Sequence, residues 1–447
     1  MKSLWPIWWI SLAVKIVIAV LLPFANDEAY YWVWGHHPAL SYFDHPGMVG
    51  WLFLLGSWLE GFGNAARLPG VLLAHCTLLI WCDLVTPFLK SEKEKYGWFL
   101  LILFSPFLGL GSLLLTPDSP FLFFWSLSLW LLLRAVRTNR LGFYAALGAA
   151  LGLGFCSKYL IVLFVPCAFV WLFVSKAWRS VDTKKVLVTV IVGLLFSAPV
   201  LLWNSSHDWV SFKFQLDHGL GATEWSARWP LEYLAAQIAL LFPIAVYFAV
   251  REKSAPGTSH FQIFGWLPFA FFFYSSFRAR GEANWPAMAH PEILALAYIG
   301  ANGSKWIKSQ ASLWAILTAL IFVQVLWPWI PVEPQKLKTS EFTKYDAFAS
   351  VASERNDLFL SSYQMAAAVS YKARRQFYKL AGMNRRDFYD FMPESYPTGD
   401  SFVVGTELGQ SLPKWVSEAG YSVVNERQLS NQFRLIEVSR SAKDGHR

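Results

Sequence analysis

The chain has few charged residues and few cysteines. Charged side chains make up 15% of its 447 residues, 55% of the residues are hydrophobic, and the mean hydropathy is +0.36. Soluble domains rarely combine these values. The four cysteines lie inside or beside apolar runs without the spacing of a metal site, so we interpret them as small core residues: Cys76, Cys82, Cys156 and Cys167.

Several cofactor and targeting signatures are also missing. The sequence contains no P-loop, no dinucleotide fingerprint and no internal repeat, so we expect no nucleotide cofactor. The first apolar run is too long for a cleavable signal peptide, and we expect it to remain as an anchor. The net charge of +8 does not indicate a nucleic-acid partner, because the basic residues cluster in alternate short loops.

Long hydrophobic runs dominate the sequence. About eleven of them reach or approach the length that spans a bilayer, which predicts a polytopic α-helical membrane protein. Segment 47–60 is apolar but short, so we expect an interfacial helix within the external loop 25–67. The expected spans are 4–24, 68–89, 97–115, 119–136, 141–157, 159–175, 186–203, 231–250, 260–277, 284–301 and 311–331.

The distribution of lysine and arginine predicts the orientation. Basic clusters occur near 90–95, 134–140, 176–185, 251–253 and 305–308, whereas no Lys or Arg occurs from Ala25 to Ala66. If the N-terminus is cytoplasmic, all of these clusters are cytoplasmic too, as the positive-inside rule requires. The loop 25–67 and the C-terminal tail then face outward.

The composition changes after the last apolar run. Residues 332–447 are polar, with strand-like runs at 401–404 and 433–438 and a helix-like segment at 410–420. A proline-punctuated linker at 327–334 precedes them. We therefore expect a membrane domain at 1–331 and a small extracytoplasmic α/β domain at 332–447.

Chemically capable residues from distant parts of the chain fall on the predicted outer face. The most informative is the carboxylate pair Asp27-Glu28, which directly follows the first span and suggests acid/base or metal chemistry. Carboxylates can deprotonate an acceptor hydroxyl, and cations can hold a phosphate, so the set indicates a reaction on an anionic lipid-linked substrate. Its other members are Tyr42, Asp44, His45, Asp118, Lys158, Arg278, Arg280, Glu282 and Asn284.

Structural explanations remain open for most of these residues. Asp27 could cap a helix, with Glu28 at its positive end, and Asp44-His45 could form only a turn. Asp118 could cap the fourth span, and Lys158 could reach lipid headgroups. Arg278 and Arg280 are harder to explain structurally, because basic residues are otherwise sparse on that side.

Five short motifs occur in order along the chain. They are Asp27-Glu28-Ala29-Tyr30-Tyr31-Trp32, Tyr42-Phe43-Asp44-His45-Pro46, Thr116-Pro117-Asp118-Ser119-Pro120, Gly152-Leu153-Gly154-Phe155-Cys156-Ser157-Lys158-Tyr159 and Arg280-Gly281-Glu282-Ala283-Asn284-Trp285-Pro286. At these residues the chain resembles the bacterial branch of the protein O-mannosyltransferase superfamily, GT-C-fold glycosyltransferases of the family 39 type. That branch includes aminoarabinose and galacturonic acid transferases that modify lipid A. Segments 362–365 and 384–386 also resemble the extracytoplasmic domain of some bacterial members.

The resemblance implies a GT-C fold and an inverting transfer of sugar from a polyprenyl-phosphate donor to an acceptor outside the cytoplasm. Asp27 would be the general base, with Glu28 beside it. Asp44 would help Asp27 to bind a divalent metal ion, for which Mg, Mn and Zn stay open. Asp118 would orient or support the donor or acceptor site.

The cations would hold the donor phosphate. The resemblance gives this role to Lys158 and Arg280, with Arg278 as a neighbour and with Tyr42, Glu282 and Asn284 as further site residues. His45 departs from the Lys usual there in aminoarabinose-transferase-like members, which leaves its contact with the phosphate open.

The expected partners are the polyprenyl-phosphate-linked sugar, a lipid A or other glycan acceptor, and membrane lipids. We expect a monomer in the bacterial inner membrane, with its active site and C-terminal domain facing the periplasm. A flippase for a lipid-linked sugar is the alternative, which would favour ionisable residues near the midplane and an internal repeat. A non-catalytic assembly protein whose outer domain binds glycan is the third hypothesis.

Overall fold

The computed structural model describes residues 2–220, 225–251, 256–302, 304–330 and 338–440. Lys253 of the fourth basic cluster and residues 331–337 lie outside this part, so the domain boundary expected at residue 331 stays a prediction. The chain forms two compact units. The membrane unit comprises Met1–Leu22 with Ala39–Val323, and the C-terminal unit comprises Pro23–Pro38 with Gln324–Arg447.

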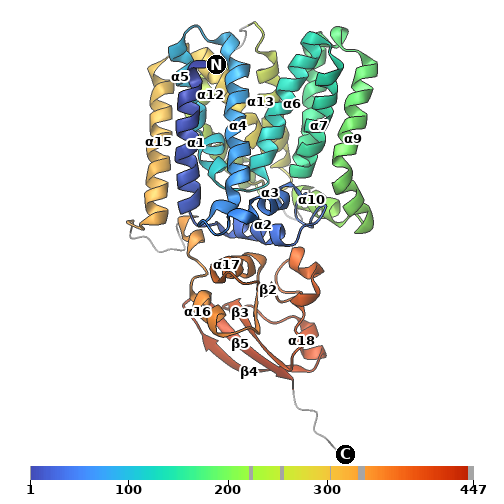
Figure 1. The fold of residues 1–447 in the computed structure, drawn as a ribbon, viewed down its shortest axis with the longest axis vertical. Coiled ribbons are helices and arrows are strands. Elements are labelled where there is room, and N and C mark those ends of the chain that lie inside the picture. The colour runs from blue at the N-terminus through green and yellow to red at the C-terminus, as the bar shows by residue number, and fades with distance from the viewer. Residues whose placement is uncertain (1, 221–224, 252–255, 303, 331–337, 441–447) are drawn as a thin grey trace, which may run out of the picture. The chain divides into compact units, whose positions relative to one another are not determined.

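The membrane unit is a bundle of helices (Figure 1). Each run expected to span the bilayer contains a helix or a pair of helices, because apolar side chains surround a backbone that satisfies its own hydrogen bonds. The helices are α1 (Trp5–Leu21), α3 (Met48–Gly56), α4 (Leu68–Val85), α5 (Glu92–Leu103), α6 (Asp118–Thr138), α7 (Leu141–Ser157), α8 (Phe164–Val174), α9 (Thr183–Ser206), α10 (Val210–Leu220), α11 (Arg228–Leu241), α12 (Pro243–Arg251), α13 (Ser259–Ser275), α14 (His290–Ala301) and α15 (Lys305–Leu326).

Helix length supports fewer membrane crossings than the sequence predicts. In the described residues, five helices are long and apolar enough to cross a membrane, and two bent pairs raise the number to seven. The segment expected to be interfacial forms the nine-residue α3 and one 3-10 turn, at Ser57–Leu59. Multi-pass membrane character follows from these helices, whereas eleven spans stay a prediction.

Two of the expected spans are bent. A bend of 70° separates α5 from the turn at Pro106–Leu113, and one of 91° separates α11 from α12. Each second segment begins with a proline, which has no N–H to continue the helix before it. At the second bend Phe242 has a φ of 61°, a left-handed backbone that ends α11.

Helices α7 and α9 lie side by side in Figure 1 and approach closely through glycines. A Cβ atom at Gly148 would lie 2.3 Å from the carbonyl oxygen of Thr189, and one at Gly152 would lie 2.6 Å from that of Gly193. Small residues of this kind bring helix backbones together in membranes. The position of α7, the fifth expected span, is therefore fixed by its contact with α9, the seventh.

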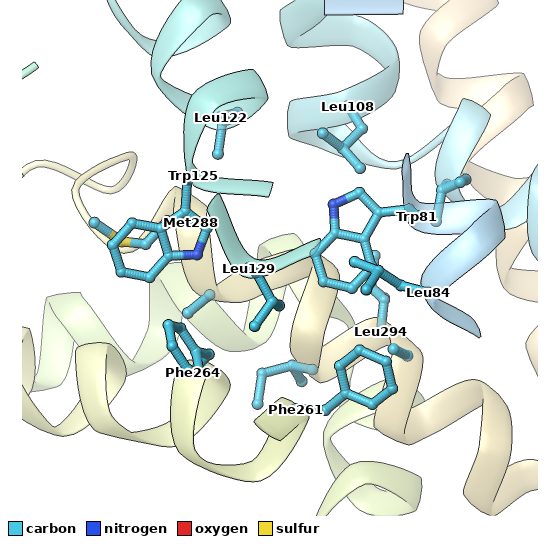
Figure 2. Close-up of a cluster of buried hydrophobic side chains, with 14 of the residues drawn as sticks. Trp81, Leu84, Leu108, Leu122, Trp125, Leu129, Phe261, Phe264, Met288 and Leu294 are labelled. Atoms are coloured by element: carbon cyan, nitrogen blue, oxygen red, sulfur yellow. The ribbon is translucent and has the colours of Figure 1, made fainter. Parts of the chain in front are cut away.

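Large aromatic and aliphatic side chains fill the core of the bundle (Figure 2). Trp81 of α4 and Trp125 of α6 are both fully buried, and Phe261 and Phe264 of α13 pack against them. The indole of Trp81 donates to Ser126 Oγ at 2.8 Å. A buried Trp thus keeps a hydrogen-bond partner while contributing apolar area.

A lysine connects the first span to the bend after α5. Lys15, in the middle of α1, is 5% exposed. Its Nζ donates to Ser112 Oγ at 2.6 Å and to the Leu108 carbonyl at 3.0 Å. Buried polar groups need such partners, so this lysine has a structural explanation.

The C-terminal unit contains a five-stranded mixed sheet with the order β2-β1-β3-β5-β4. Its first three strands are parallel, and β5 pairs antiparallel with β3 and β4. Strands β3 and β5 contain the two runs predicted to be strands, and α18 lies within 410–420. The elements are α2 (Asn26–His36), α16 (Ala347–Glu354), β1 (Leu358–Leu360), α17 (Tyr363–Ala373), β2 (Tyr378–Lys379), β3 (Ser401–Glu407), α18 (Lys414–Glu418), β4 (Tyr421–Gln428) and β5 (Phe433–Arg440).

Helix α2 is the unexpected member of this unit, because it comes from the loop after the first span. Its Tyr30 and Trp34, one turn apart, are 1% and 0% exposed. The Tyr30 ring lies 6.0 Å from Tyr389, and the Trp34 ring lies 6.2 Å from Phe388. The Phe388 backbone N–H donates to Tyr30 Oη at 2.9 Å, so an aromatic stripe holds α2 against the segment after β2.

Candidate active site

Asp118, Lys158 and Asn284 come together in the membrane unit. Lys158 Nζ lies 2.6 Å from Asp118 Oδ1, and Asn284 Nδ2 donates to Asp118 Oδ2 at 2.7 Å. Both oxygens of this carboxylate are therefore used to hold the two neighbours. The structure joins three predicted site residues that are 40 and 166 positions apart in sequence.

Local backbone structure explains how the pair is presented. Asp118 is the first residue of α6, and Pro117 occupies the N-cap, so capping by the Asp118 side chain does not explain this aspartate. Lys158 follows the last residue of α7 in an extended conformation and is 8% exposed. A side chain this buried is not reaching for lipid headgroups. Its charge is balanced by the Asp118 carboxylate.

A mostly apolar cavity of about 160 Å³ lies beside this pair, and Asp118 forms part of its wall. The hydroxyl of Thr77, in the same wall, is buried and has no hydrogen-bond partner among the described residues. The cavity is lined by Ala74, Thr77, Phe107, Leu108, Gly111, Ser112, Leu114, Thr116, Asp118, Ser119 and Leu122. Lys158 is not part of the wall, so of the pair only the Asp118 residue borders this apolar space.

Residues 41–46 form a tight turn before α3. A single bridge pairs Ser41 with Pro46, and the Tyr42 backbone N–H donates to the His45 carbonyl at 3.1 Å. Gln215 of α10 donates to the Asp44 carbonyl at 2.5 Å, and the Asp44 residue is 3% exposed. The turn expected as a structural alternative is therefore present. It buries the Asp44 side chain rather than leaving it in solvent.

Tyr42 is part of the same turn. Its Oη accepts a hydrogen bond from the Ala39 N–H at 3.1 Å, and burial raises the pKa of the phenol above its usual range. His45 is half-buried. These contacts give Tyr42 a role in the shape of the turn.

The arginines of segment 278–284 lie apart from the Asp118–Lys158 pair. Arg280 contacts Glu232 of α11 at 3.2 Å, and its side chain is 73% exposed. Arg278 donates to the Tyr274 hydroxyl at 3.1 Å, and both Arg278 and Glu282 are exposed. Within the described contacts, only Asn284 of this segment reaches the pair.

Two residues that the sequence did not single out support this segment. Gln237 of α11 donates to the Ala283 carbonyl at 3.0 Å, and its side-chain oxygen lies 2.8 Å from His290 Nε2. Gln237 and His290 are 4% and 3% exposed. A lone Gln and a lone His in apolar runs give no pattern from which this contact could have been predicted.

Asp27 and Glu28 lie in the first turn of α2, in the C-terminal unit. The N-cap is Ala25, so the structural alternative in which Asp27 caps the helix is wrong. Glu28 is fully buried, whereas Asp27 is exposed. Tyr363, at the start of α17, donates from its hydroxyl to Asp27 Oδ1 at 3.5 Å. Of the two residues, Asp27 is the one exposed to solvent.

In the described residues, no group of three or more His, Cys, Asp or Glu side chains is arranged to hold a metal ion. A zinc site uses three or four protein ligands, whereas Mg²⁺ often binds through one or two carboxylates and substrate phosphates.

Comparisons with known proteins agree on one class. A sequence profile described as dolichyl-phosphate-mannose-protein mannosyltransferase matches residues 44–203. The lipid A galacturonosyltransferase RgtD of Rhizobium johnstonii is 24% identical over 89% of this chain and 90% of its own length. An undecaprenyl phosphate-α-4-amino-4-deoxy-L-arabinose arabinosyl transferase of Edwardsiella ictaluri is 27% identical over 66% of this chain and 60% of its own length.

Solved structures share the fold. ArnT from Cupriavidus metallidurans bound to undecaprenyl phosphate aligns with a TM-score of 0.66 at 14% identity, over 98% of each chain. The apo form of the same protein aligns with a TM-score of 0.67 over the same shares. Together with the profile and the relatives, this likeness identifies the chain as a multi-pass membrane glycosyltransferase of the GT-C fold.

Proposed function

We propose that this enzyme moves a sugar from a polyprenyl-phosphate donor to lipid A or another envelope glycan, with inversion at the anomeric carbon. The observation that carries the proposal is the buried Lys158–Asp118 pair beside an apolar cavity. The relatives are named for lipid A and for an undecaprenyl-phosphate sugar, and one solved structure holds undecaprenyl phosphate. Those names support this donor and acceptor class.

Asp27 is proposed as the general base. Its carboxylate takes the proton of the acceptor hydroxyl, the hydroxyl oxygen attacks the anomeric carbon, and the bond from that carbon to the phosphate oxygen breaks. Polyprenyl phosphate leaves with the bonding electron pair. Exposure of Asp27, in contrast to the buried Glu28, supports this assignment.

Lys158 is proposed to hold the donor phosphate and to neutralise the charge that the leaving group gains. Asp118 and Asn284 keep the Lys158 ammonium in place, which is a supporting role. Arg280, Arg278 and His45 are proposed as further phosphate contacts. The exposure of both arginines suits them to meet a substrate that arrives from outside the protein.

A divalent cation is proposed at Asp27 and Asp44, with Mg²⁺ or Mn²⁺ favoured over Zn²⁺ because the ligands are two carboxylates. When bound, the ion would neutralise part of the charge on the donor phosphate. The location proposed is the bacterial inner membrane, with the site and the C-terminal unit facing the periplasm. The basic loops support that orientation.

Transfer by the purified full-length protein tests the proposal. Donors are a panel of polyprenyl-phosphate sugars, acceptors are lipid A and an envelope lipid extract, and one arm contains a chelator. We expect transfer by the wild type and a loss of roughly 100-fold or more in Asp27→Asn and Lys158→Met. Asp400→Asn, at a side chain 91% exposed in the same unit as Asp27, and Lys184→Met, at an exposed lysine, are the matched controls.

Two results would contradict this reading. If Asp27→Asn and Lys158→Met both transfer sugar at the wild-type rate, Asp27 is not the base and Lys158 is not the phosphate contact. Movement of the lipid-linked sugar across the membrane by wild-type protein that transfers nothing would favour the flippase. An unchanged transfer rate in the presence of the chelator would contradict only the proposed divalent cation.

A further inference from the structure

The C-terminal unit surrounds Asp27 with groups to which the proposed reaction gives no role. Asp27 and Tyr30 are three residues apart on α2, so both lie on the face that carries the aromatic stripe. Tyr30 is buried in that stripe, whereas Asp27 stands at its open end. The packing of α2 within the C-terminal unit therefore fixes the helix that carries the Asp27 carboxylate.

Tyr363 connects α17 to this carboxylate. It is the first residue of α17, after Ser362, whose hydroxyl accepts from the Met365 N–H and caps the helix. The Tyr363 ring lies 4.5 Å from the Tyr30 ring, and its hydroxyl lies 3.5 Å from Asp27 Oδ1. Contacts of this kind are often long in an unliganded enzyme and shorten when substrate is bound.

Arg385 lies over Tyr363 on the other side. Its guanidinium carbon is 4.5 Å from the centre of the Tyr363 ring, within the range of a cation–π contact. The positive charge draws electron density from the phenol, which strengthens its hydroxyl as a donor to a carboxylate.

A buried ionic cluster fixes the backbone that carries Arg385. Lys379 Nζ, fully buried, donates to the Arg385 carbonyl at 2.9 Å and to Asp387 Oδ2 at 2.6 Å. It also donates to Asp390 Oδ2 at 2.5 Å, and Asp390 Oδ1 accepts from the Gly382 N–H at 2.9 Å. The loop from residue 380 to residue 391 is thus tied at several points, and Arg385 is presented from a rigid support.

We propose that Tyr363, with Arg385 over its ring, is a positioning residue for the Asp27 carboxylate. The C-terminal unit then takes part in catalysis by orienting the base. This inference rests on the proposed function for the role of Asp27. It adds two residues, Tyr363 and Arg385, that would hold the proposed base in place.

The test uses the full-length enzyme with the donor and acceptor of the transfer assay. We expect Tyr363→Phe to lower kcat roughly 5- to 20-fold at neutral pH, the effect of losing one hydrogen bond to a charged group, with KM nearly unchanged. Arg385→Gln should act in the same direction, and Arg385→Lys should recover part of the loss because it keeps the cation. Tyr396→Phe and Arg427→Gln, at exposed positions of the same unit, are the matched controls.

Two outcomes separate this inference from the proposed function. Wild-type kcat and KM in Tyr363→Phe would overturn the inference even if Asp27→Asn is inactive. A wild type that transfers nothing would overturn the proposed function and this inference with it.

Discussion

Replacing Lys379 by methionine tests the ionic cluster of the C-terminal unit. The Lys379 and Asp387 side chains are fully buried, and that of Asp390 is 12% exposed. One ammonium therefore compensates two carboxylates that solvent barely reaches. In Lys379→Met both carboxylates lose this partner, and the Arg385 carbonyl loses its donor.

The expected cost is large because the change leaves buried charge behind. Removing one partner of a buried ion pair destabilises a protein by about 3–5 kcal/mol. For a unit of this size, that corresponds to a fall of roughly 2–3 M in the urea midpoint. Lys344→Met is the matched control, because the Lys344 and Glu407 side chains are 37% and 43% exposed. An exposed pair contributes less than about 1 kcal/mol.

Pulse proteolysis of the full-length protein in urea measures both variants. Cleavage within the C-terminal unit, read on gels, gives the fraction unfolded at each urea concentration. Similar small shifts for Lys379→Met and Lys344→Met would refute the argument that burial makes the Lys379 cluster important.

Further predictions concern helix packing, acid stability and the first span. Gly148→Ala should cost about 1–3 kcal/mol because its Cβ would meet the Thr189 carbonyl, whereas Gly142→Ala on the same helix has open space and should be neutral; thermal unfolding in detergent separates them. Arg355, which contacts Asp357 at 3.0 Å, holds the pKa of that carboxyl below its usual range. The stabilisation from this pair is present at neutral pH and is lost as pH falls below about 4, so the difference in urea midpoint between wild type and Asp357→Asn should shrink from pH 6 to pH 3. A constant difference would contradict that assignment. Lys15→Met removes two hydrogen bonds of α1 and should lower stability by about 1–3 kcal/mol, measured by thermal unfolding against Lys184→Met.

The sequence predicted the helical bundle well, because apolar runs of this length have few alternatives in a membrane. It placed Asp118, Lys158 and Asn284 on the same face of the membrane but did not predict that they touch. Which polar groups touch depends on side-chain packing between α6, α7 and segment 278–284, and hydropathy carries no information about that. The number of crossings could not be settled either, since bends at Pro106 and Pro243 divide runs that look continuous.

The assignment of α2 to the C-terminal unit was not predictable for a different reason. Tyr30 and Trp34 would suit a membrane interface as well as a protein core, and Phe388, which contacts both, lies more than 350 residues away. The resemblance of segments 362–365 and 384–386 to extracytoplasmic domains was visible in the sequence. The contact of Tyr363 with Asp27 was not, because no local pattern links positions 336 residues apart.

The distance along the chain between Asp27 and Tyr363 has a consequence for biosynthesis. The two residues are 336 positions apart, so a ribosome that adds 5–20 residues each second makes Tyr363 roughly 20–70 s after Asp27. During that interval α2 has left the ribosome without α17 and the segment at Phe388 and Tyr389, which pack against its aromatic stripe. Its exposed tyrosines and tryptophans are then available to chaperones and proteases. A chain that stops before Tyr363 lacks the contacts by which α17 and the segment at Phe388 hold the helix of the proposed catalytic carboxylate.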